Sequence, residues 1–333
     1  MGRRASLIRS VLTLAAAGTL WLPTTAVGQG VATPDSPRRV EVLLYLIDLI
    51  EITGFDQSFF ADFYMEASWH DPGLAGGSEE RRKLDLDDVW NPALLVVNLR
   101  SASRSLPAVV RVDPEGNVSY TQRFTGRFSA PMNLRNFPLD EQRLHLWLVA
   151  TDGPIEEVEL VQGEASILRA ERLSITDWDV GEIRFEQADY SATPNAVAIS
   201  GLSLSIDVDR RVEYYIIQVL IPLIAIVMMS WSVYWVDSSV VATRMGVAVT
   251  TMLTLIAYRF MLGNLVPRLS YLTRLDYFMF GATTLVILTL FVMAGTSYLK
   301  SRGRDAAVAR IDSFGRMAFP VIFALFTLVV WVL

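Results

Sequence analysis

The sequence contains no cysteine and only two histidines, His70 and His145, which lie far apart in the chain. Disulfide bonds, thiolate metal sites and cysteine nucleophiles are therefore excluded, and a histidine-rich metal centre is disfavoured. No glycine-rich phosphate loop follows a strand pattern, and no nucleophile–base pair stands out. We therefore expect neither an enzyme nor a bound metal or cofactor.

Charge is also scarce. Charged residues make up 19% of the chain and hydrophobic residues 52%, with a formal net charge of −6. A soluble protein of this size would usually carry more charge. No basic stripe is available to neutralise phosphates, so a nucleic-acid partner is not expected. The apolar residues concentrate after Tyr214, which divides the chain into two unlike parts.

The N-terminus has the composition of a targeting segment. Three arginines among the first nine residues precede an Ala-rich apolar stretch from Leu12 to Leu22, and small residues follow at 26–28. This order predicts a secretory signal peptide over residues 1–30. A fifth membrane helix is the alternative, but the apolar core is shorter than the roughly 20 residues that a bilayer requires. Export would place residues 31–212 outside the cytoplasm.

Residues 31–212 alternate between apolar and polar side chains. Three leucines share one face of the stretch 144–148, with His145 and Trp147 on the other, and residues 202–208 alternate in the same way. Turn-forming residues at 113–117 join strand patterns at 109–112 and 118–124, which predicts a hairpin. Many short strands with frequent turns favour an immunoglobulin-like antiparallel β-sandwich.

Residues 213–333 carry four long apolar segments, at about 214–236, 241–262, 276–299 and 316–333. Each can cross a hydrocarbon core of about 30 Å as a helix, so a four-helix transmembrane bundle is expected. The third-to-fourth connection carries Lys300, Arg302, Arg304 and Arg310. The positive-inside rule places this connection in the cytoplasm, in agreement with an exported N-terminal domain.

The second apolar segment carries an unusual stripe. Its residues recur at spacings of 4, 3, 4 and 3 and so share one helix face; they are Gly246, Thr250, Leu253, Ala257 and Phe260. Such a face can line a water-filled pore, with Leu253 and Phe260 as constrictions that close by dewetting. Threonines that bond to neighbouring helices or to their own backbone explain the same pattern. The spacing alone leaves both interpretations open.

Several motifs, taken together and in order, resemble those of prokaryotic pentameric ligand-gated ion channels, the bacterial homologues of the Cys-loop receptors. Phe137-Pro-Leu-Asp-Glu-Gln142 is similar to the signature that closes the Cys-loop in animal receptors, with the cysteines absent as in bacterial members. The other motifs are Trp90–Asn98, Arg211–Tyr215 with Ile221–Pro222, Trp231–Trp235, Asn264–Tyr271 and Arg316–Pro320.

The resemblance implies a homopentamer in a bacterial inner membrane, with the sandwich in the periplasm and lipid around the helices. The second helices would surround a central pore for permeant ions. A small-molecule or proton agonist would bind between neighbouring sandwiches and open the pore. In this arrangement the stripe from Gly246 to Phe260 lines the pore, and Leu253 occupies the position of the hydrophobic gate.

The resemblance also implies an agonist site, to which we assign Tyr64, Thr121, Thr151, Asp152, Phe185 and Tyr190. Tyr64 and Thr121 would come from the neighbouring subunit. For the aromatic residues a place in the core is equally compatible. Thr151 stands where amine-binding members often carry an aromatic ring, so no amine agonist is assigned. Proton gating requires titrating carboxylates, for which Asp152 and Glu186 are candidates.

Charged contacts between sandwich and helices are a further family feature. Asp140 and Arg211 match two of these positions, which predicts a salt bridge that couples the two domains. Asp56 is the candidate acid in the first hairpin loop, and Pro267 would stiffen the linker after the pore helix.

Asp237 and Arg244 are assigned to the cytoplasmic mouth of the pore. No acid directly precedes Arg244, and the loop from Trp235 to Arg244 has the length found in anion-selective members. Helix N-termini that converge at the mouth favour anions. We therefore expect an anion-selective channel. A cation-selective or proton-gated channel of the same family, and a non-channel receptor or transporter, are the alternatives.

Overall fold

The computed structural model describes residues 36–76, 80–164, 168–263 and 269–332. The segment expected to be a signal peptide and the linker residue Pro267 lie outside this part of the chain. The strands are β1 (Arg38–Thr53), β2 (Ser58–His70), β3 (Arg82–Asp85), β4 (Leu94–Val96), β5 (Leu99–Arg104), β6 (Val109–Val112), β7 (Asn117–Ser129), β8 (Glu141–Ala150), β9 (Val158–Gln162), β10 (Trp178–Gln187) and β11 (Gly201–Arg210).

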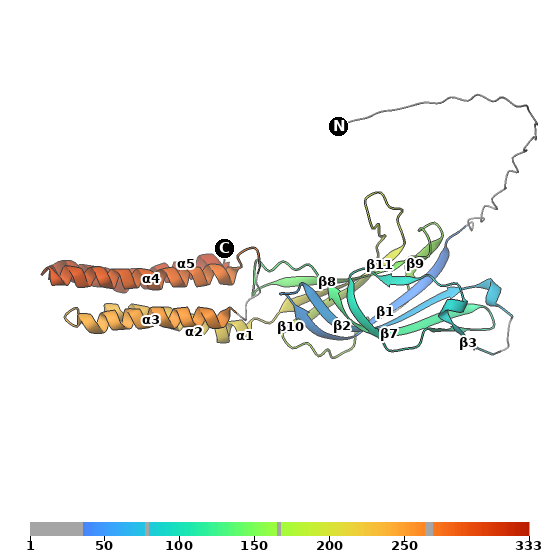
Figure 1. The fold of residues 1–333 in the computed structure, drawn as a ribbon, viewed down its shortest axis with the longest axis horizontal. Coiled ribbons are helices and arrows are strands. Elements are labelled where there is room, and N and C mark those ends of the chain that lie inside the picture. Colours follow the sequence, from blue (N-terminus) through green and yellow to red (C-terminus); the bar gives the residue numbers. More distant parts are fainter. Residues whose placement is uncertain (1–35, 77–79, 165–167, 264–268, 333) are drawn as a thin grey trace, which may run out of the picture. The chain divides into compact units, whose positions relative to one another are not determined.

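The strands form two sheets (Figure 1). The first has the order β3-β6-β7-β2-β1-β9, with β5 also paired to β7, and the second has the order β10-β11-β8-β4. Neighbouring strands are antiparallel except β1 and β9, which are parallel. The parallel pair arises because the chain crosses from β8 in one sheet to β9 in the other. The predicted β-sandwich is confirmed, with this one pair as its departure from a purely antiparallel arrangement.

The predicted alternation and the predicted hairpin are both present. In β8 the three leucines at 144, 146 and 148 are buried, while Trp147 lies on the outer face. Asp113 closes the hairpin between β6 and β7: its Oδ1 accepts a hydrogen bond from the Asn117 amide at 2.8 Å. Gly116 has φ +87°, which a residue with a side chain rarely adopts.

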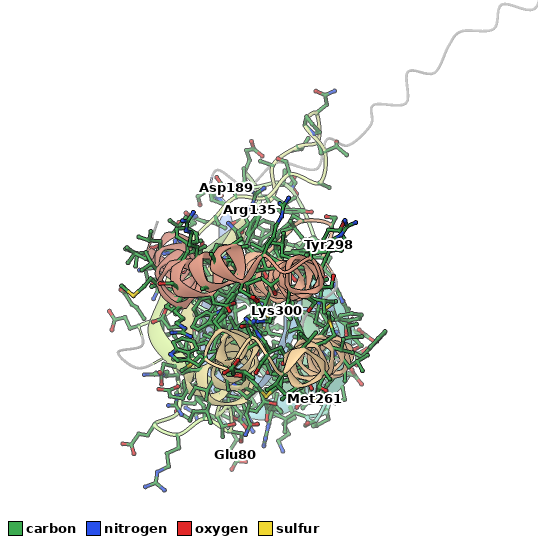
Figure 2. The ribbon with its side chains drawn as sticks, turned by 90° about the vertical axis from the view of Figure 1, so that its left-hand side faces the viewer. Glu80, Arg135, Asp189, Met261, Tyr298 and Lys300 are labelled. Carbon is green, nitrogen blue, oxygen red and sulfur yellow. The ribbon has the colours of Figure 1, made fainter. Side chains whose placement is uncertain are left out.

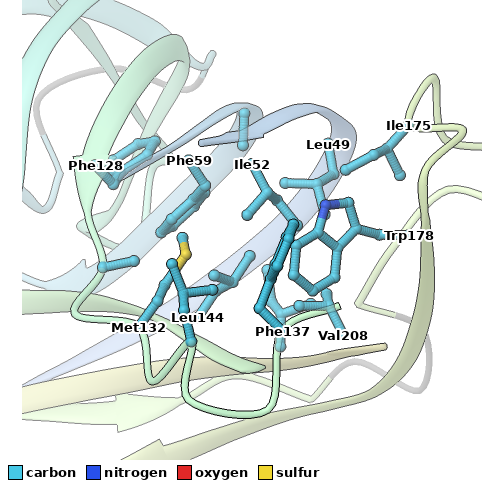
Figure 3. Close-up of a cluster of buried hydrophobic side chains, with 14 of the residues drawn as sticks. Leu49, Ile52, Phe59, Phe128, Met132, Phe137, Leu144, Ile175, Trp178 and Val208 are labelled. Carbon is cyan, nitrogen blue, oxygen red and sulfur yellow. The ribbon is translucent and has the colours of Figure 1, made fainter. Parts of the chain in front are cut away.

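The core of the sandwich lies between the sheets and reaches the end of the domain next to the helices. Phe59 and Phe128 stack with ring centroids 5.0 Å apart. Figure 3 shows this region, where Phe137 and Trp178 join the cluster from segments outside the central strands. Burial of each such side chain contributes about 1.5–3 kcal/mol, so this end of the sandwich is well packed.

Within the described part of the chain, four helices are long and apolar enough to cross a membrane. The first runs from Glu213 to Tyr234 and consists of α1 (Glu213–Tyr215), a π-helical turn η3 (Ile216–Leu220), α2 (Ile221–Trp231) and a 3₁₀ turn η4 (Ser232–Tyr234). The others are α3 (Val241–Leu262), α4 (Arg274–Ser301) and α5 (Asp305–Val332).

The π-helical turn η3 has a local cause in Pro222. Proline has no amide hydrogen, so it cannot donate to the carbonyl of Gln218 four residues before. The turn widens to i→i+5 bonding, and the amide of Ile221 donates to Ile216. The hydroxyl of Tyr258 in α3 donates to the Gln218 carbonyl at 3.0 Å and to the Val219 carbonyl at 2.8 Å. A side chain from the neighbouring helix thus supplies the missing donor.

The start of α5 differs most from the predicted segments. α5 begins at Asp305 rather than near residue 316, so the turn between α4 and α5 contains only Arg302–Arg304. Hydropathy detects only the apolar part of a helix, whereas hydrogen bonding continues into its polar first turns. At the start of α4, Thr273 and Asp276 form a capping box, which fixes this helix end just before the apolar run.

Candidate functional site

The stripe on α3 faces away from the helices of its own subunit. All five of its residues are exposed: Gly246, Thr250, Leu253, Ala257 and Phe260. Leu253 is 60% and Phe260 79% exposed. A Cβ atom on Gly246 would meet nothing within 4 Å. The opposite side of α3 is buried, at Arg244, Ala248, Thr251, Leu255 and Leu262. The helix therefore presents one packed face and one free face.

Arg244 is not exposed at the pore mouth, where the sequence analysis placed it. Its side chain is only 4% exposed and lies inside the bundle. Nη2 is paired with Asp312 of α5, and Nε donates to the carbonyl of Val233 at 3.2 Å. Position 244 precedes Gly246 by two residues, which is about 200° around a helix, so it belongs to the packed face.

Asp237, the second residue assigned to the mouth, is exposed in the turn between η4 and α3. Its Oδ1 accepts a hydrogen bond from the Ser239 amide at 2.7 Å. Hydrogen bonding from Ser239 lowers the pKa of this carboxyl, so Asp237 stays ionised near neutral pH. Asp237 and Arg244 therefore each bond to a different partner, Ser239 and Asp312, rather than to one another.

The segment 130–140, here called the joining segment, connects the sandwich to the helices through hydrogen bonds. The amide of Leu134 donates to the hydroxyl of Tyr271 at 3.0 Å. The amide of Arg274, at the start of α4, donates to the carbonyl of Arg135 at 2.9 Å. The turn between β1 and β2 supports this segment through Gln57, whose carbonyl accepts from the Ala130 amide at 2.8 Å. Asp56, the predicted coupling acid, is exposed in the same turn.

The predicted salt bridge of Asp140 has the wrong partner. Asp140 pairs with Arg210, through Nε–Oδ1 at 2.8 Å and Nη2–Oδ2 at 3.2 Å. Gln142 Nε2 also donates to Asp140 Oδ2 at 2.8 Å. The side chains of Arg210 and Asp140 are 7% and 1% exposed. Bidentate, charge-assisted hydrogen bonds of this kind are stronger than neutral ones, and the loss of either partner would leave the other charge buried and unpaired.

Arg210 is also surrounded by aromatic rings. Its guanidinium lies 4.1 Å from the ring centroid of Trp178, 5.0 Å from that of Phe137 and 5.8 Å from that of Tyr215. Trp178 is its cross-strand partner in β10, Phe137 belongs to the joining segment, and Tyr215 belongs to α1. Cation–π attraction therefore connects the sandwich core with the first membrane helix.

Arg211 points the other way. It pairs with Asp179 at 2.6 Å, with both side chains largely exposed. The hydrogen bond from Arg211 lowers the pKa of Asp179. Successive residues of a strand face opposite sides, and Val208 in β11 faces the core, so Arg210 faces the core and Arg211 does not. The alternation of residues 202–208 is the sequence signal that distinguishes Arg210 from Arg211.

The predicted agonist-binding residues fall in several places. Thr151 is exposed, and its hydroxyl donates to the Ala93 carbonyl at 2.7 Å. Thr151 and Ala93 line a cavity of about 350 Å³ next to β2 and β7. Asp152 is exposed in the turn after β8. Tyr64 and Thr121 lie half-buried on neighbouring strands of the other sheet. One subunit does not bring these residues together.

Phe185 is not available to a ligand. It is 5% exposed and lies opposite Leu204 of β11, which is fully buried. Both side chains therefore face the core of the sandwich, as a position opposite a buried residue requires. The assignment of Phe185 to the agonist site requires an accessible ring, whereas the structure buries this side chain. Strand register across a hairpin of this length cannot be derived from one sequence.

Tyr190 lies beside an aromatic residue that the sequence-based assignment missed. Its ring centroid is 6.1 Å from that of Trp147, which is 42% exposed. Together with His145 and Glu186 these two rings line a hollow of about 300 Å³ on the outer face of β8, β10 and β11. An exposed tryptophan on the polar side of an alternating strand was the available signal.

Charge is arranged closely around the outer face of this sheet. Asp207 accepts hydrogen bonds from Arg143 at 2.6 Å and from Arg184 at 2.5 Å. The bond from Arg143 is the main cause that lowers the pKa of Asp207. Burial lowers the pKa of His145, and the nearby charge of Arg143 lowers it further. This histidine is therefore held neutral to a lower pH than usual.

Basic side chains gather at the end of the helices that is far from the sandwich, in the turn between α4 and α5. Figure 2 views the bundle from this end, where Tyr298 and Lys300 are labelled. Arg302 lies over the Tyr298 ring at 5.3 Å, and Lys300 pairs with Asp305 at 2.6 Å. Such a basic turn is typical of the cytoplasmic side of a membrane protein.

Comparisons with known proteins agree with this architecture. A family profile described as "Neurotransmitter-gated ion-channel ligand binding domain" matches residues 29–212, and one described as "Neurotransmitter-gated ion-channel transmembrane region" matches residues 219–308. A protein of Gloeobacter violaceus named "Proton-gated ion channel" is 24% identical over 92% of this chain and 88% of that protein.

A second relative is the "Gamma-aminobutyric acid receptor subunit beta-4" of Gallus gallus, 25% identical over 79% of this chain. The chain spans 56% of that subunit's length. Together, the two profile matches cover a sandwich and a set of membrane helices in the order seen here. The chain is a membrane protein that belongs to the neurotransmitter-gated ion-channel family, the pentameric ligand-gated ion channels.

Proposed function

We propose that the chain is a subunit of a homopentameric ligand-gated channel in which α3 lines the ion pathway. The observation that carries this proposal is the division of α3 into a packed face and a free face. Thr250 and Leu253 lie on the free face, together with Gly246. A stripe with small and hydroxyl-bearing residues suits contact with water, whereas the residues that α5 exposes over its apolar part are mainly large and apolar.

The threonines do not all argue for water. Thr251 donates to the Val247 carbonyl at 2.8 Å, and Thr254 donates to the Thr250 carbonyl at 2.9 Å. These two bonds are those expected of hydroxyls that satisfy their own helix. The proposal therefore depends on the exposed stripe as a whole, and above all on Leu253, rather than on hydroxyl content.

The agonist would bind between neighbouring sandwiches in the periplasm. Thr151, Asp152 and Tyr190 belong to the loops after β8 and β10, and Tyr64 and Thr121 belong to the first sheet. Two separate surfaces of one subunit can form a single site only across an interface, which supports binding between subunits. Trp147, beside Tyr190, takes the place given to Phe185.

For selectivity we propose anions over cations. The first turn of α3 contains no acidic residue, and the charge of Arg244 is paired with Asp312. The positive ends of the α3 helices would therefore dominate the mouth, opposed by Asp237 in the preceding turn. The second candidate is a cation-selective, proton-gated channel, which the name of the Gloeobacter relative favours.

Cysteine accessibility tests the proposed pathway. Because the chain has no cysteine, one introduced thiol is unique. Leu253→Cys and Thr250→Cys should be blocked by a charged thiosulfonate reagent when acidification or a screened agonist opens the reconstituted channel. Leu255→Cys and Thr251→Cys, on the packed face, are the matched controls and should resist the reagent.

Block at the packed positions without block at the exposed ones would refute the assignment of α3. Reversal potentials under a salt gradient then decide selectivity. A shift toward the cation equilibrium potential would favour the second candidate over the anion channel.

A further inference from the structure

The end of the bundle far from the sandwich contains a partly buried polar cluster, here called the basal cluster. It consists of Arg244 of α3, Asp312 and Arg316 of α5, and Val233 and Tyr234 of η4. Arg244 connects Asp312 with the Val233 carbonyl. Arg316 Nε donates to the Tyr234 carbonyl at 2.9 Å. The cluster therefore holds the first turn of α3 between the first and the last membrane helices.

The ion pair in the basal cluster is deeply buried. The side chains of Arg244 and Asp312 are 4% and 8% exposed. A lone charge in such a place is strongly unfavourable, so each of these groups depends on the other. In this arrangement the positive charge of Arg244 is neutralised inside the subunit rather than presented at its surface.

Close packing holds Asp312 in position. Gly315 follows it by three residues and so lies on the same face of α5. A Cβ atom at Gly315 would lie 2.5 Å from Cε1 of Tyr234, so α5 contacts this ring with no room for a side chain. Tyr234 is fully buried and packs on Phe319, with ring centroids 5.1 Å apart. α5 cannot shift here without breaking this contact.

We propose that Asp312 is a specificity-determining residue of the channel, because it keeps the charge of Arg244 out of the ion pathway. The inference rests on the proposed function of α3. In that arrangement residues 242, 243 and 246 are exposed around the mouth. The side chain of Arg244, between them in sequence, is buried inside the subunit. Without its partner, a long arginine side chain would extend toward the nearest water, which is the mouth.

A residue of α5, a helix that is not proposed to line the pathway, would thus control the charge of the pathway. Asp312 acts through Arg244 and does not touch the permeant ion, so it is a positioning residue. A merely structural role would change stability and assembly but not the ratio of anion to cation permeability. That ratio is therefore the measurement that separates the two roles.

The test uses full-length protein in planar bilayers under a salt gradient. Asp312→Asn should raise the anion-to-cation permeability ratio by about tenfold, the low end of the range by which a charged cleft concentrates counter-ions. Arg244→Gln combined with Asp312→Asn removes both charges and should return the ratio to that of the unsubstituted protein. Asp305→Asn is the matched control, because it breaks the exposed Lys300 pair at the same end of the bundle.

Each outcome has a defined meaning. An unchanged ratio in an open Asp312→Asn channel, or an equal shift in Asp305→Asn, would overturn the inference. If Asp312→Asn fails to assemble, the double variant decides: assembly with the original ratio supports the inference, and an altered ratio contradicts it. The cysteine block at Leu253 is measured separately, so failure of the inference and failure of the proposed pathway are distinguishable.

Discussion

Arg210 carries a full charge into the apolar end of the sandwich, and the contacts around it compensate for its lost hydration. Asp140 binds two of its nitrogens, and three aromatic rings surround the guanidinium. Asp140 also accepts a hydrogen bond from Gln142 Nε2. Because these rings belong to both the sandwich and α1, the pair stabilises the junction as well as its own strands.

Asp140→Asn should therefore destabilise the protein strongly. Removal of one partner leaves the other charge buried and unpaired, which costs about 3–5 kcal/mol. Thermal or denaturant unfolding of the detergent-solubilised protein measures this loss. Asp179→Asn is the matched control, since it breaks the exposed pair with Arg211 and should leave the unfolding transition where it was. Equal destabilisation by both variants would contradict the assigned difference between the two pairs.

Single residues were also the hardest features to predict from the sequence. The family resemblance assigns Arg211 rather than Arg210 to the coupling pair, and it places Arg244 at the pore mouth. In both, the period of the element gives the correct side: alternation turns Arg210 inward, and the 3.6-residue period puts Arg244 opposite the exposed stripe. Their partners could not have been predicted, since Asp312 lies 68 residues beyond Arg244 in the chain.

At the level of elements, α3 is the part of the molecule on which the proposed function depends. It contacts α2 and α4 through its packed face, and Tyr258 bonds to the carbonyls of η3. Its free face carries Leu253 among smaller residues, which makes this the bulkiest apolar position in the middle of the stripe. A ring of such side chains excludes water from a narrow pore.

Leu253→Ser should favour the open state. Loss of leucine contacts in the closed pore shifts the open–closed equilibrium by about 1.5–3 kcal/mol, which is roughly tenfold or more. Spontaneous leak and the agonist or proton concentration for half-maximal current measure this shift. Met252→Ser is the control, because Met252 is half-buried on α3 and lies about 100° around the helix from Leu253. The same shift in both variants would remove Leu253 from the gate.

The elements themselves followed closely from the sequence. Alternation identified strands such as β8 and β11, and apolar length identified four helices, because both patterns arise from local burial. Helix ends were less certain: α5 begins well before the apolar run, at Asp305. The π-helical turn η3 was not foreseen, although Pro222 is its visible cause.

At the level of the whole molecule, sandwich stability should depend on the protonation of His145. Burial lowers the pKa of His145, so below its ordinary value near 6.5 the unfolded chain binds a proton that the folded chain does not. Stability is therefore present above about pH 6.5 and falls as the pH drops below it. The fall ends once the folded histidine is also protonated.

The unfolding temperature of the full-length protein, measured from neutral to mildly acidic pH, tests this dependence. His145→Gln should reduce the slope in this window. An unchanged slope in His145→Gln would assign the pH dependence to other groups. Such a stability slope is separate from proton gating, which is measured as current.

The bond from Tyr258 to η3 also constrains how the bundle can assemble. Within the lipid bilayer no water is available to bond the Gln218 carbonyl that Pro222 leaves without its usual donor. The first membrane helix alone would consequently leave this carbonyl without a hydrogen-bond donor, and Tyr258 of the second helix supplies that donor. We therefore expect these two helices to enter the membrane together as a hairpin. The helix that follows the sandwich and the helix proposed to line the pore would then pack against each other during biosynthesis, before the subunit meets its neighbours.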